Sequence, residues 1–179
     1  TNCDTESLLH GYTEYGVEIF SKLNGMFSIA IWDDRTKELF LCRDRAGEKP
    51  LYYYLDDNKI IFGSEIKSLL QYPNLIKEIN WDAFNEYFSF GYISAPNSIY
   101  KNIHKVKQGC YIKYKNGIIS DNRYWRINTS LKFEGNYNEA KVQLNNILED
   151  SVKIRLNSDV PLGAFLSGGL DSSAIVATM

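Results

Sequence analysis

The sequence is poor in the residues that mark several protein classes. It has 3 cysteines, 2 histidines and 4 prolines among 179 residues. The cysteines, Cys3, Cys42 and Cys110, are far apart and show none of the spacings of a metal site. We therefore expect free, mostly buried thiols in a reducing compartment rather than a disulfide framework.

Long apolar runs and an excess of one charge are missing as well. No run approaches the roughly 18 apolar residues that cross a bilayer. No signal peptide is recognisable, so we expect a cytoplasmic protein with no membrane partner. The net charge is −2 with both signs mixed along the chain, which gives no footprint for nucleic acid. Hydrophobic residues make up 44% of the chain, enough for one or two domains with apolar cores.

Short helices and hairpins are predicted over the first two thirds of the chain. Apolar residues at helical spacing indicate a helix at 4–15, with Asp4 as its N-cap. From residue 26 the apolar period becomes two, which indicates strands joined by polar loops. Both faces of the first predicted strand, 26–32, are largely apolar, so we expect a second sheet on one face and helices on the other. The further predicted helices are 17–23, 65–70 and 81–90, and the further strands are 38–43, 51–55, 59–63, 109–114 and 117–120.

The architecture is predicted to change in the last third of the chain. Residues 127–138 are polar and aperiodic, and we interpret them as a linker between two domains. Asn138 can cap a helix at 139–156, which carries an apolar stripe and ends in basic residues. A buried strand at 160–166 and a helix from Asp171 follow, an order unlike the hairpins upstream.

The turn between that strand and helix has the composition of a phosphate-binding loop. Gly168 and Gly169 can adopt positive φ and let the backbone approach an anion closely. The following helix offers free N–H groups and the positive end of its dipole, and Ser167, Ser172 and Ser173 add hydroxyl donors. A plain strand-to-helix turn is the alternative. The complete Ser-Gly-Gly-x-Asp-Ser-Ser run in this position favours the phosphates of ATP as ligand.

Asp171 is the unexpected residue of this loop. A carboxylate repels phosphates unless a cation lies between them, so Asp171 predicts Mg²⁺ held by one carboxylate, phosphate oxygens and water. A Walker loop would instead carry a lysine at the start of its helix. The sequence therefore predicts ATP and Mg²⁺ as the ligands of this segment.

Residues 166–173 resemble the PP-loop of ATP pyrophosphatases, which cleave ATP to AMP and pyrophosphate. The wider run of residues 155–173 resembles the glutamine-hydrolysing asparagine synthetases in particular, and so do residues 23–33, 43–53 and 63–70. The similarity covers essentially the whole chain, which makes it far more specific than the loop alone.

The resemblance implies an incomplete two-domain enzyme, cut on both sides of the present sequence. Residues 1–126 would be the later part of a glutaminase domain of the N-terminal-nucleophile (Ntn) hydrolase type, an α+β four-layer αββα sandwich. Residues 127–138 would be the linker, and residues 139–179 the start of an α/β PP-loop ATP-binding domain. The implied reaction makes asparagine from aspartate and ATP through an acyl-adenylate, with ammonia from glutamine and release of AMP and pyrophosphate. A homodimer is one candidate assembly of the parent enzyme.

The resemblance also assigns site residues. Leu166 would lie against the adenine nucleoside, the rest of the loop would hold phosphate, and Asp171 would bind Mg²⁺. Asp4 matches the residue that pairs with the α-ammonium group of glutamine, with a helix N-cap as the alternative. The implied ATP-binding residues are Leu166, Ser167, Gly168, Gly169, Leu170, Asp171, Ser172 and Ser173.

No catalytic residue is assigned in this chain. The cysteine nucleophile of the family stands at the mature N-terminus of its glutaminase domain, and we expect it upstream of the present sequence. Thr1 and Cys3 resemble N-terminal nucleophiles in type, but their segment matches a position in the middle of the family domain. We therefore reject both as nucleophiles.

Two other interpretations stay open. A relative that amidates or cyclises another carboxylate, such as a sugar acid in surface-polysaccharide synthesis or a β-lactam precursor, would share these motifs. The chain is also compatible with an inactive truncated product, whose unpaired strand at 160–166 would favour aggregation.

Overall fold

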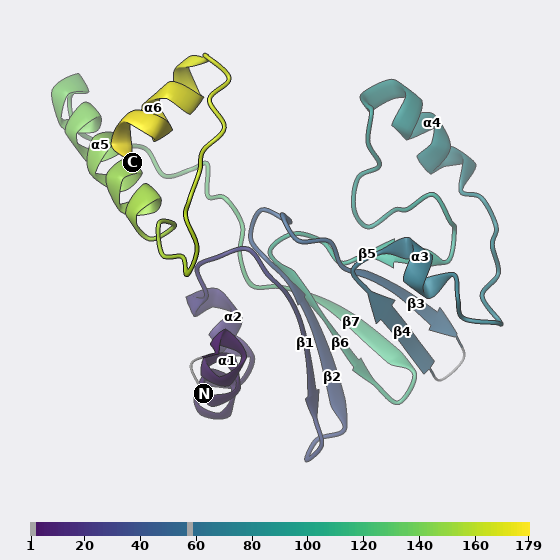
Figure 1. Ribbon diagram of the computed structural model, residues 1–179. Helices are drawn as coiled ribbons and strands as arrows, with labels where there is room; N and C mark the ends of the chain where they lie inside the picture. Colours follow the sequence, from purple (N-terminus) through teal and green to yellow (C-terminus); the bar gives the residue numbers. More distant parts are fainter. Residues whose placement is uncertain (1–2, 57–58) are drawn as a thin grey trace. The chain divides into compact units, whose positions relative to one another are not determined.

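The computed structural model describes residues 3–56 and 59–179 (Figure 1). The chain divides into two compact units, Thr1–Ile127 and Asn128–Met179. The first unit is of the α+β class and is built on antiparallel hairpins, whereas the second consists of two helices joined by an extended segment. Within the described residues, every helix is too short or too polar to cross a bilayer.

The first helix, α1, spans Asp4–Tyr15 and confirms the prediction for 4–15. Its N-cap is Cys3, whose side chain makes no capping hydrogen bond, and Asp4 is the first helical residue. The prediction of Asp4 as N-cap was therefore wrong, although a carboxylate in the first turn is still favoured by the helix dipole. The predicted helix at 17–23 is shorter and consists of a 3₁₀ turn, η1, followed by a single turn, α2. Their bounds are Gly16–Glu18 and Ile19–Lys22.

The larger sheet has the strand order β1-β2-β6-β7 and is antiparallel throughout. Alternation along β2 places Leu39 and Leu41 on one face and Phe40 and Cys42 on the other, and all four are buried. The sheet is therefore covered on both faces at this strand. Its strands are β1 Ser28–Asp33, β2 Glu38–Arg43, β6 Cys110–Lys115 and β7 Ile118–Arg123.

The smaller sheet, of order β4-β3-β5, shares one core with the larger sheet. This core joins Leu39, Leu41 and Ile112 of the larger sheet to Leu51 and Tyr53. Sequence reasoning missed β5, because a three-residue strand is too short to show a period of two. The strands are β3 Tyr52–Asp56, β4 Lys59–Gly63 and β5 Ile103–Lys105.

Helical segments cover the outer faces of the two sheets (Figure 1). Phe20 of α2 packs against Phe40 on the larger sheet. Leu69 of the short helix α3, Ile66–Leu69, packs against Tyr54 on the smaller sheet. Helical residues thus pack on each sheet outside the core that the two sheets share.

One face of β1 is open, contrary to the prediction of a strand buried on both faces. Ile29 and Ile31 belong to the core on the helix side. Trp32, on the opposite face, is 54% exposed, and Ala30 on that face is exposed as well. β1 is an edge strand of its sheet. Among the described residues, the core between the two sheets contains residues of β2 and β6 and none of β1.

Helix α4, Trp81–Phe90, confirms the predicted helix at 81–90. The Asn80 side chain caps it by accepting a hydrogen bond from the Ala83 N–H (3.2 Å). Gly91 ends it in the left-handed conformation, with φ of 77°. The capping asparagine and the terminal glycine are both local features of the sequence, which explains why the bounds of this helix can be predicted.

The second unit contains α5, Tyr137–Lys153, and α6, Leu170–Thr178. The N-cap of α5 is Asn136 rather than the predicted Asn138, which lies inside the helix. Asn136 and Glu139 form a capping box, in which each side chain accepts the backbone N–H of the other residue, at 3.1 and 2.9 Å. Two bonds favour Asn136 over a cap that would satisfy only one N–H group.

The predicted buried strand at 160–166 is absent, and the segment is extended and exposed along its whole length. In the described part of the chain no strand pairs with it. Apolar character does not suffice for a strand, because the backbone N–H and C=O groups need partners on a neighbouring strand.

The loop between β2 and β3 is held by one buried carboxylate, that of Asp44, which is 1% exposed. Its Oδ1 accepts the backbone N–H groups of Ala46 (3.1 Å) and Glu48 (3.0 Å), and its Oδ2 accepts that of Lys49 (2.9 Å). The neighbouring Arg43 guanidinium donates to three carbonyl groups around the same loop. Burial by itself raises the pKa of Asp44, but the backbone donors of Lys49 and Glu48 outweigh it and hold the pKa below its ordinary value.

We expect Asp44→Ala to lower the free energy of unfolding of the first unit by about 2–4 kcal/mol, because several backbone donors lose their acceptor in a buried site. Asp44→Asn keeps one oxygen and should lose about half as much. The three tryptophans all lie in this unit, so urea unfolding followed by tryptophan fluorescence reports it directly. Asp34→Ala, in an exposed hairpin turn, is the control and should cost less than about 1 kcal/mol. Equal losses for D44A and D34A would contradict this role of Asp44.

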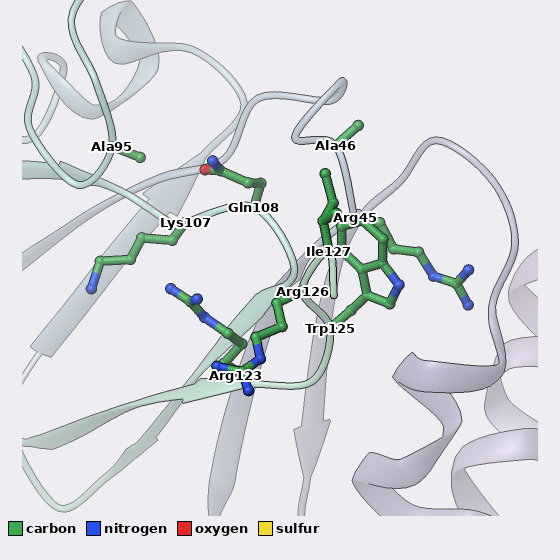
Figure 2. Close-up of a pocket in the computed structure, with 9 residues that line it drawn as sticks. All are labelled: Arg45, Ala46, Ala95, Lys107, Gln108, Arg123, Trp125, Arg126 and Ile127. Atoms are coloured by element: carbon green, nitrogen blue, oxygen red, sulfur yellow. The ribbon is translucent and has the colours of Figure 1, made fainter. Parts of the chain in front are cut away.

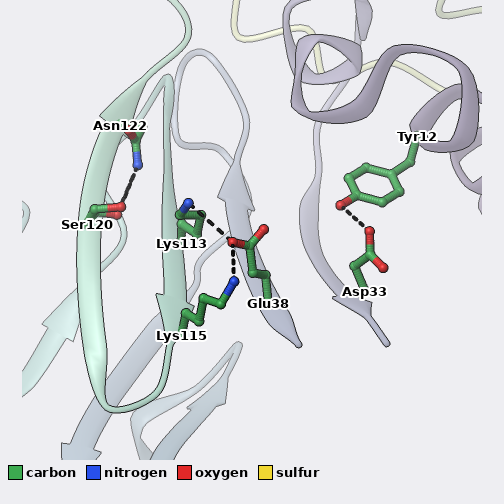
Figure 3. A network of polar contacts seen from close by, with 7 residues as sticks. All are labelled: Tyr12, Asp33, Glu38, Lys113, Lys115, Ser120 and Asn122. Carbon is green, nitrogen blue, oxygen red and sulfur yellow. Dashed lines mark hydrogen bonds and ion pairs between the residues drawn. The ribbon is translucent and has the colours of Figure 1, made fainter. Parts of the chain in front are cut away.

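A second polar contact joins α1 to the first hairpin (Figure 3). The Tyr12 hydroxyl donates to Asp33 Oδ2 (3.2 Å), and the Arg35 guanidinium donates to both oxygens of the same carboxylate (3.3 and 3.2 Å). The hydrogen bond from Arg35 is the main reason why the pKa of Asp33 is lowered to about 2. Burial, followed by the bond to Asp33, raises the pKa of Tyr12 to about 12.

These shifts predict a loss of stability on the acid side. A carboxyl group with a lowered folded-state pKa stabilises the fold above its unfolded pKa near 3.8, and this contribution is lost as the pH falls toward about 2. We expect the urea midpoint to fall over this window and the Asp33→Asn variant to show a flatter acid limb from a lower starting midpoint. Parallel acid limbs for the two proteins would show that Asp33 does not titrate with folding.

Candidate functional sites

The predicted phosphate loop lies at the amino terminus of α6. Gly168 has φ of +78°, and Gly169 is the N-cap. The Ser172 hydroxyl donates to the Gly169 carbonyl (3.1 Å) and lies 2.9 Å from the Ser167 hydroxyl. The chain thus folds back on the first turn of the helix, and it does so through the small and hydroxyl-bearing residues of the motif.

The first turn of α6 is open to a ligand. Its cap is a glycine, which has no side chain to accept the free N–H groups. The Asp171 and Ser173 side chains are exposed, and Ser172 is half-buried. Leu166 precedes the turn in the extended segment and is exposed, as is Leu170 in the helix. The predicted phosphate contacts therefore form one continuous turn whose N–H and hydroxyl donors suit an oxyanion.

The donor set of this loop fits Mg²⁺ only together with a ligand that supplies more oxygens. Asp171 is the one carboxylate of the loop. Across residues 3–56 and 59–179 there is no group of three His, Cys, Asp or Glu side chains that could hold a metal. Because Mg²⁺ is commonly held by one or two carboxylates with phosphate oxygens and waters, the loop fits a phosphate-bridged ion.

A separate cavity of about 730 Å³ lies in the first unit and contains Asp4. Helix α1 supplies Asp4, Thr5 and Leu8, and residues 23–30, which lead into β1 and form its first half, supply most of the rest. Asp4 is exposed at the first turn of α1, where its carboxylate is accessible from the cavity. Cys3 is also exposed, and its thiol donates to Asp4 Oδ1 (3.4 Å). Thr1 lies outside the described residues. The cavity is lined by Asp4, Thr5, Leu8, Leu23, Asn24, Gly25, Met26, Phe27, Ser28, Ile29, Ala30, Lys49, Pro50 and Ser64.

The Asp44 loop forms one side of this cavity. Lys49 and Pro50 line it, and the Lys49 N–H is fixed by Asp44. Ser28 of β1 donates its hydroxyl to the Pro50 carbonyl (2.9 Å), which ties the loop to the strand. Asp4 and Lys49, two residues of opposite charge, therefore both line this cavity.

Two family models match the chain, one within each of its two units. Residues 1–125 match the family described as glutamine amidotransferase domain, and residues 143–179 match the family described as asparagine synthase. The first match covers well over half of the chain, and it contains Asp4 and its cavity. The chain therefore belongs to the glutamine amidotransferase domain family.

Several of its relatives are named as asparagine synthetases. Over its whole length the chain is 40% identical to a putative glutamine-hydrolysing asparagine synthetase 2 of Methanocaldococcus jannaschii, of which it spans 35%. It is 35% and 37% identical to the glutamine-hydrolysing asparagine synthetases 3 and 1 of Bacillus subtilis, over 97% and 99% of this chain and 28% of each relative. The chain thus spans about a third or less of the curated relatives it matches.

Sequence reasoning missed part of the cavity around Asp4. Lys49 and Ser64 lie far from Asp4 in sequence, and no local pattern connects them. The signal that was available is the Asp44 segment, since an aspartate followed by a glycine-containing turn often accepts the N–H groups that follow it. That signal predicts an ordered loop, but it does not show which cavity the loop lines.

We expect Gly168→Ala to distort the phosphate loop while leaving the first unit unchanged. An added Cβ would meet nothing within 4 Å, so the cost is the left-handed backbone alone, about 1–2 kcal/mol. Gly169→Ala is the matched control, because its φ of −77° is ordinary and its nearest contact is 3.5 Å. Amide NMR should show larger shifts over residues 166–173 for G168A than for G169A. Equal shifts would contradict the observed loop conformation.

Proposed function

We propose that this chain is part of a glutamine-hydrolysing asparagine synthetase, with glutamine, aspartate and ATP as substrates. One observation carries the proposal: a single chain joins an amidotransferase match that contains the Asp4 cavity to an asparagine synthase match that contains the loop at 166–173. The first component would release ammonia and the second would activate the acceptor carboxylate.

We assign residues 1–126 to a glutaminase domain with the four-layer αββα architecture of Ntn hydrolases. The layering of helices and two sheets in the first unit supports this assignment. Residues 127–138 would be the linker and residues 139–179 the start of a PP-loop ATP-binding domain. The free and buried thiols of Cys42 and Cys110 fit a reducing compartment such as the cytoplasm.

In the glutaminase domain, Asp4 would pair with the α-ammonium group of glutamine. Its exposure on the cavity supports this role, and so does the absence of a capping role for its side chain at α1. Lys49, which lines the same cavity, has the charge required by the α-carboxylate. The nucleophile that cleaves the side-chain amide is not assigned to a residue of this chain.

In the second domain, the loop at 166–173 would orient ATP. Leu166 would contact the nucleoside, and the Ser167, Ser172 and Ser173 hydroxyls with the first N–H groups of α6 would hold the β- and γ-phosphates. An aspartate carboxylate oxygen then attacks the α-phosphorus, pyrophosphate leaves, and ammonia displaces AMP from the acyl carbon. Mg²⁺, held by Asp171 and phosphate oxygens, would neutralise charge on the departing pyrophosphate.

A second candidate is an amidotransferase with a different acceptor. The chain is 31% identical to a protein of Gibberella zeae named amidase chry2, over 97% of this chain and 26% of that protein. Relatives with another name thus share the same two segments. The candidate acceptors are the sugar acid and β-lactam precursors considered from the sequence, and acceptor-dependent release of AMP distinguishes them from aspartate.

Two substitutions test the two-site proposal in the complete enzyme. Asp171→Asn should abolish Mg²⁺-dependent pyrophosphate release while leaving glutamine hydrolysis intact, because one site is changed and the other is not. Asp4→Asn should raise the KM for glutamine at least tenfold while leaving synthesis from added ammonia intact. Glutamate, pyrophosphate and asparagine are measured for each variant.

Each variant serves as the control for the other. Loss of both half-reactions in either variant would overturn the assignment of separate sites. Pyrophosphate release that does not depend on aspartate would overturn asparagine synthesis and favour another acceptor.

A further inference from the structure

A second cavity in the first unit, of about 660 Å³, is lined by cationic side chains and by no carboxylate (Figure 2). The end of β7 and the residues that follow it form part of its lining. It shares no lining residue with the Asp4 cavity. Nothing in the proposed reaction uses it. The lining residues are Arg45, Ala46, Ala95, Lys107, Gln108, Arg123, Trp125, Arg126 and Ile127.

The positive charge of this cavity is only partly compensated. Lys107 pairs with Asp121 (Nζ to Oδ2, 2.5 Å). In the part of the chain that the structure describes, the ion pairs leave Arg45, Arg123 and Arg126 without a carboxylate partner. Arg123 and Arg126 thus bring two guanidinium groups without a carboxylate partner to the cavity, and both would attract an anion bound there.

Arg45 is held in place before any ligand arrives. Its guanidinium donates to the Ser21 carbonyl (2.8 Å) and lies 5.9 Å from the centre of the Trp125 ring. Its Nε is buried and finds no hydrogen-bond partner among the described residues. Figure 2 shows the Arg45 side chain extending past the indole of Trp125, while Lys107 lies at the opposite side of the cavity.

The backbone beneath the cavity is equally fixed. The N–H groups of Tyr124 and Trp125 both donate to the Gly109 carbonyl (2.9 and 3.1 Å). Gly109 has φ of +62°, and a Cβ at this position would lie 2.5 Å from the Trp125 carbonyl oxygen. The indole and the arginines on either side of it therefore project from a rigid turn rather than from a mobile tail.

We propose that this cavity binds a phosphate-bearing small molecule. Arg123 and Arg126 are exposed and supply fork-shaped donors that match a phosphate oxyanion, and the Gln108 amide adds a neutral donor. Trp125 offers a flat apolar surface for the rest of such a ligand. The site is independent of the proposed function, since it uses neither Asp4 nor the loop at 166–173.

The test is a titration of the full chain with pyrophosphate, followed by amide and indole NMR, in EDTA at low salt. EDTA removes the cation that the loop at 166–173 would need. We expect saturable shifts of the Trp125 indole and the Gln108 side-chain amide. The double variant Arg123→Gln/Arg126→Gln should weaken this binding at least tenfold. Lys59→Gln/Lys141→Gln removes the same charge from exposed positions elsewhere and should change it less than twofold.

Three results would overturn the proposal: shifts confined to residues 166–173, shifts that do not saturate, or equal weakening by both double variants. Urea unfolding of the arginine variant verifies that its fold is intact, and Gln108→Ala provides a second, uncharged variant with an expected several-fold loss. None of these results bears on the half-reactions of Asp171→Asn and Asp4→Asn, so failure here is distinguishable from failure of the proposed function.

Discussion

The buried carboxylate of Asp44 organises both cavities of the first unit. It accepts hydrogen bonds from the N–H groups of the loop that follows it. Residues of that loop line both cavities. Arg45 and Ala46 line the cationic cavity, whereas Lys49 and Pro50 line the cavity that contains Asp4. A single desolvated acceptor, saturated by main-chain donors, thereby sets the position of side chains in two places, because a fixed backbone leaves its side chains few alternative directions.

The two units differ in how much of their own apolar surface they bury. The first has three hydrophobic clusters that hold its sheets and helices together. In the second, Val152 is the single buried hydrophobic residue among those described, while Phe165 and Leu170 are almost fully exposed. The capping box of α5 is local and does not replace a core. The geometry of the loop at 166–173 is thus set by the short-range bonds of its serines, in a segment with few buried residues.

The sequence predicted those elements whose signals are local. Helices α1 and α4 and the hairpins follow from residue periodicity and turn residues, and the buried thiols of Cys42 and Cys110 follow from the lack of a disulfide pattern. The predictions failed where the structure of an element depends on contacts with other elements. Residues 160–166 have the composition of a strand but no strand beside them, and one face of β1 is open because the smaller sheet does not extend over it. Asn136, and not the predicted Asn138, is the N-cap of α5, because Asn136 forms the reciprocal pair of hydrogen bonds with Glu139.

By itself, the sequence predicts the class of chemistry. A short run of glycines, serines and one aspartate indicates phosphate and a cation, since a contiguous turn carries its own donors and its own charge. Only the tertiary structure brought Lys49 and Asp4 to one cavity and Arg45, Lys107 and Arg126 to another. These residues are distant along the chain, and their proximity follows from strand pairing and from the Asp44 loop, neither of which leaves a periodic trace in the sequence.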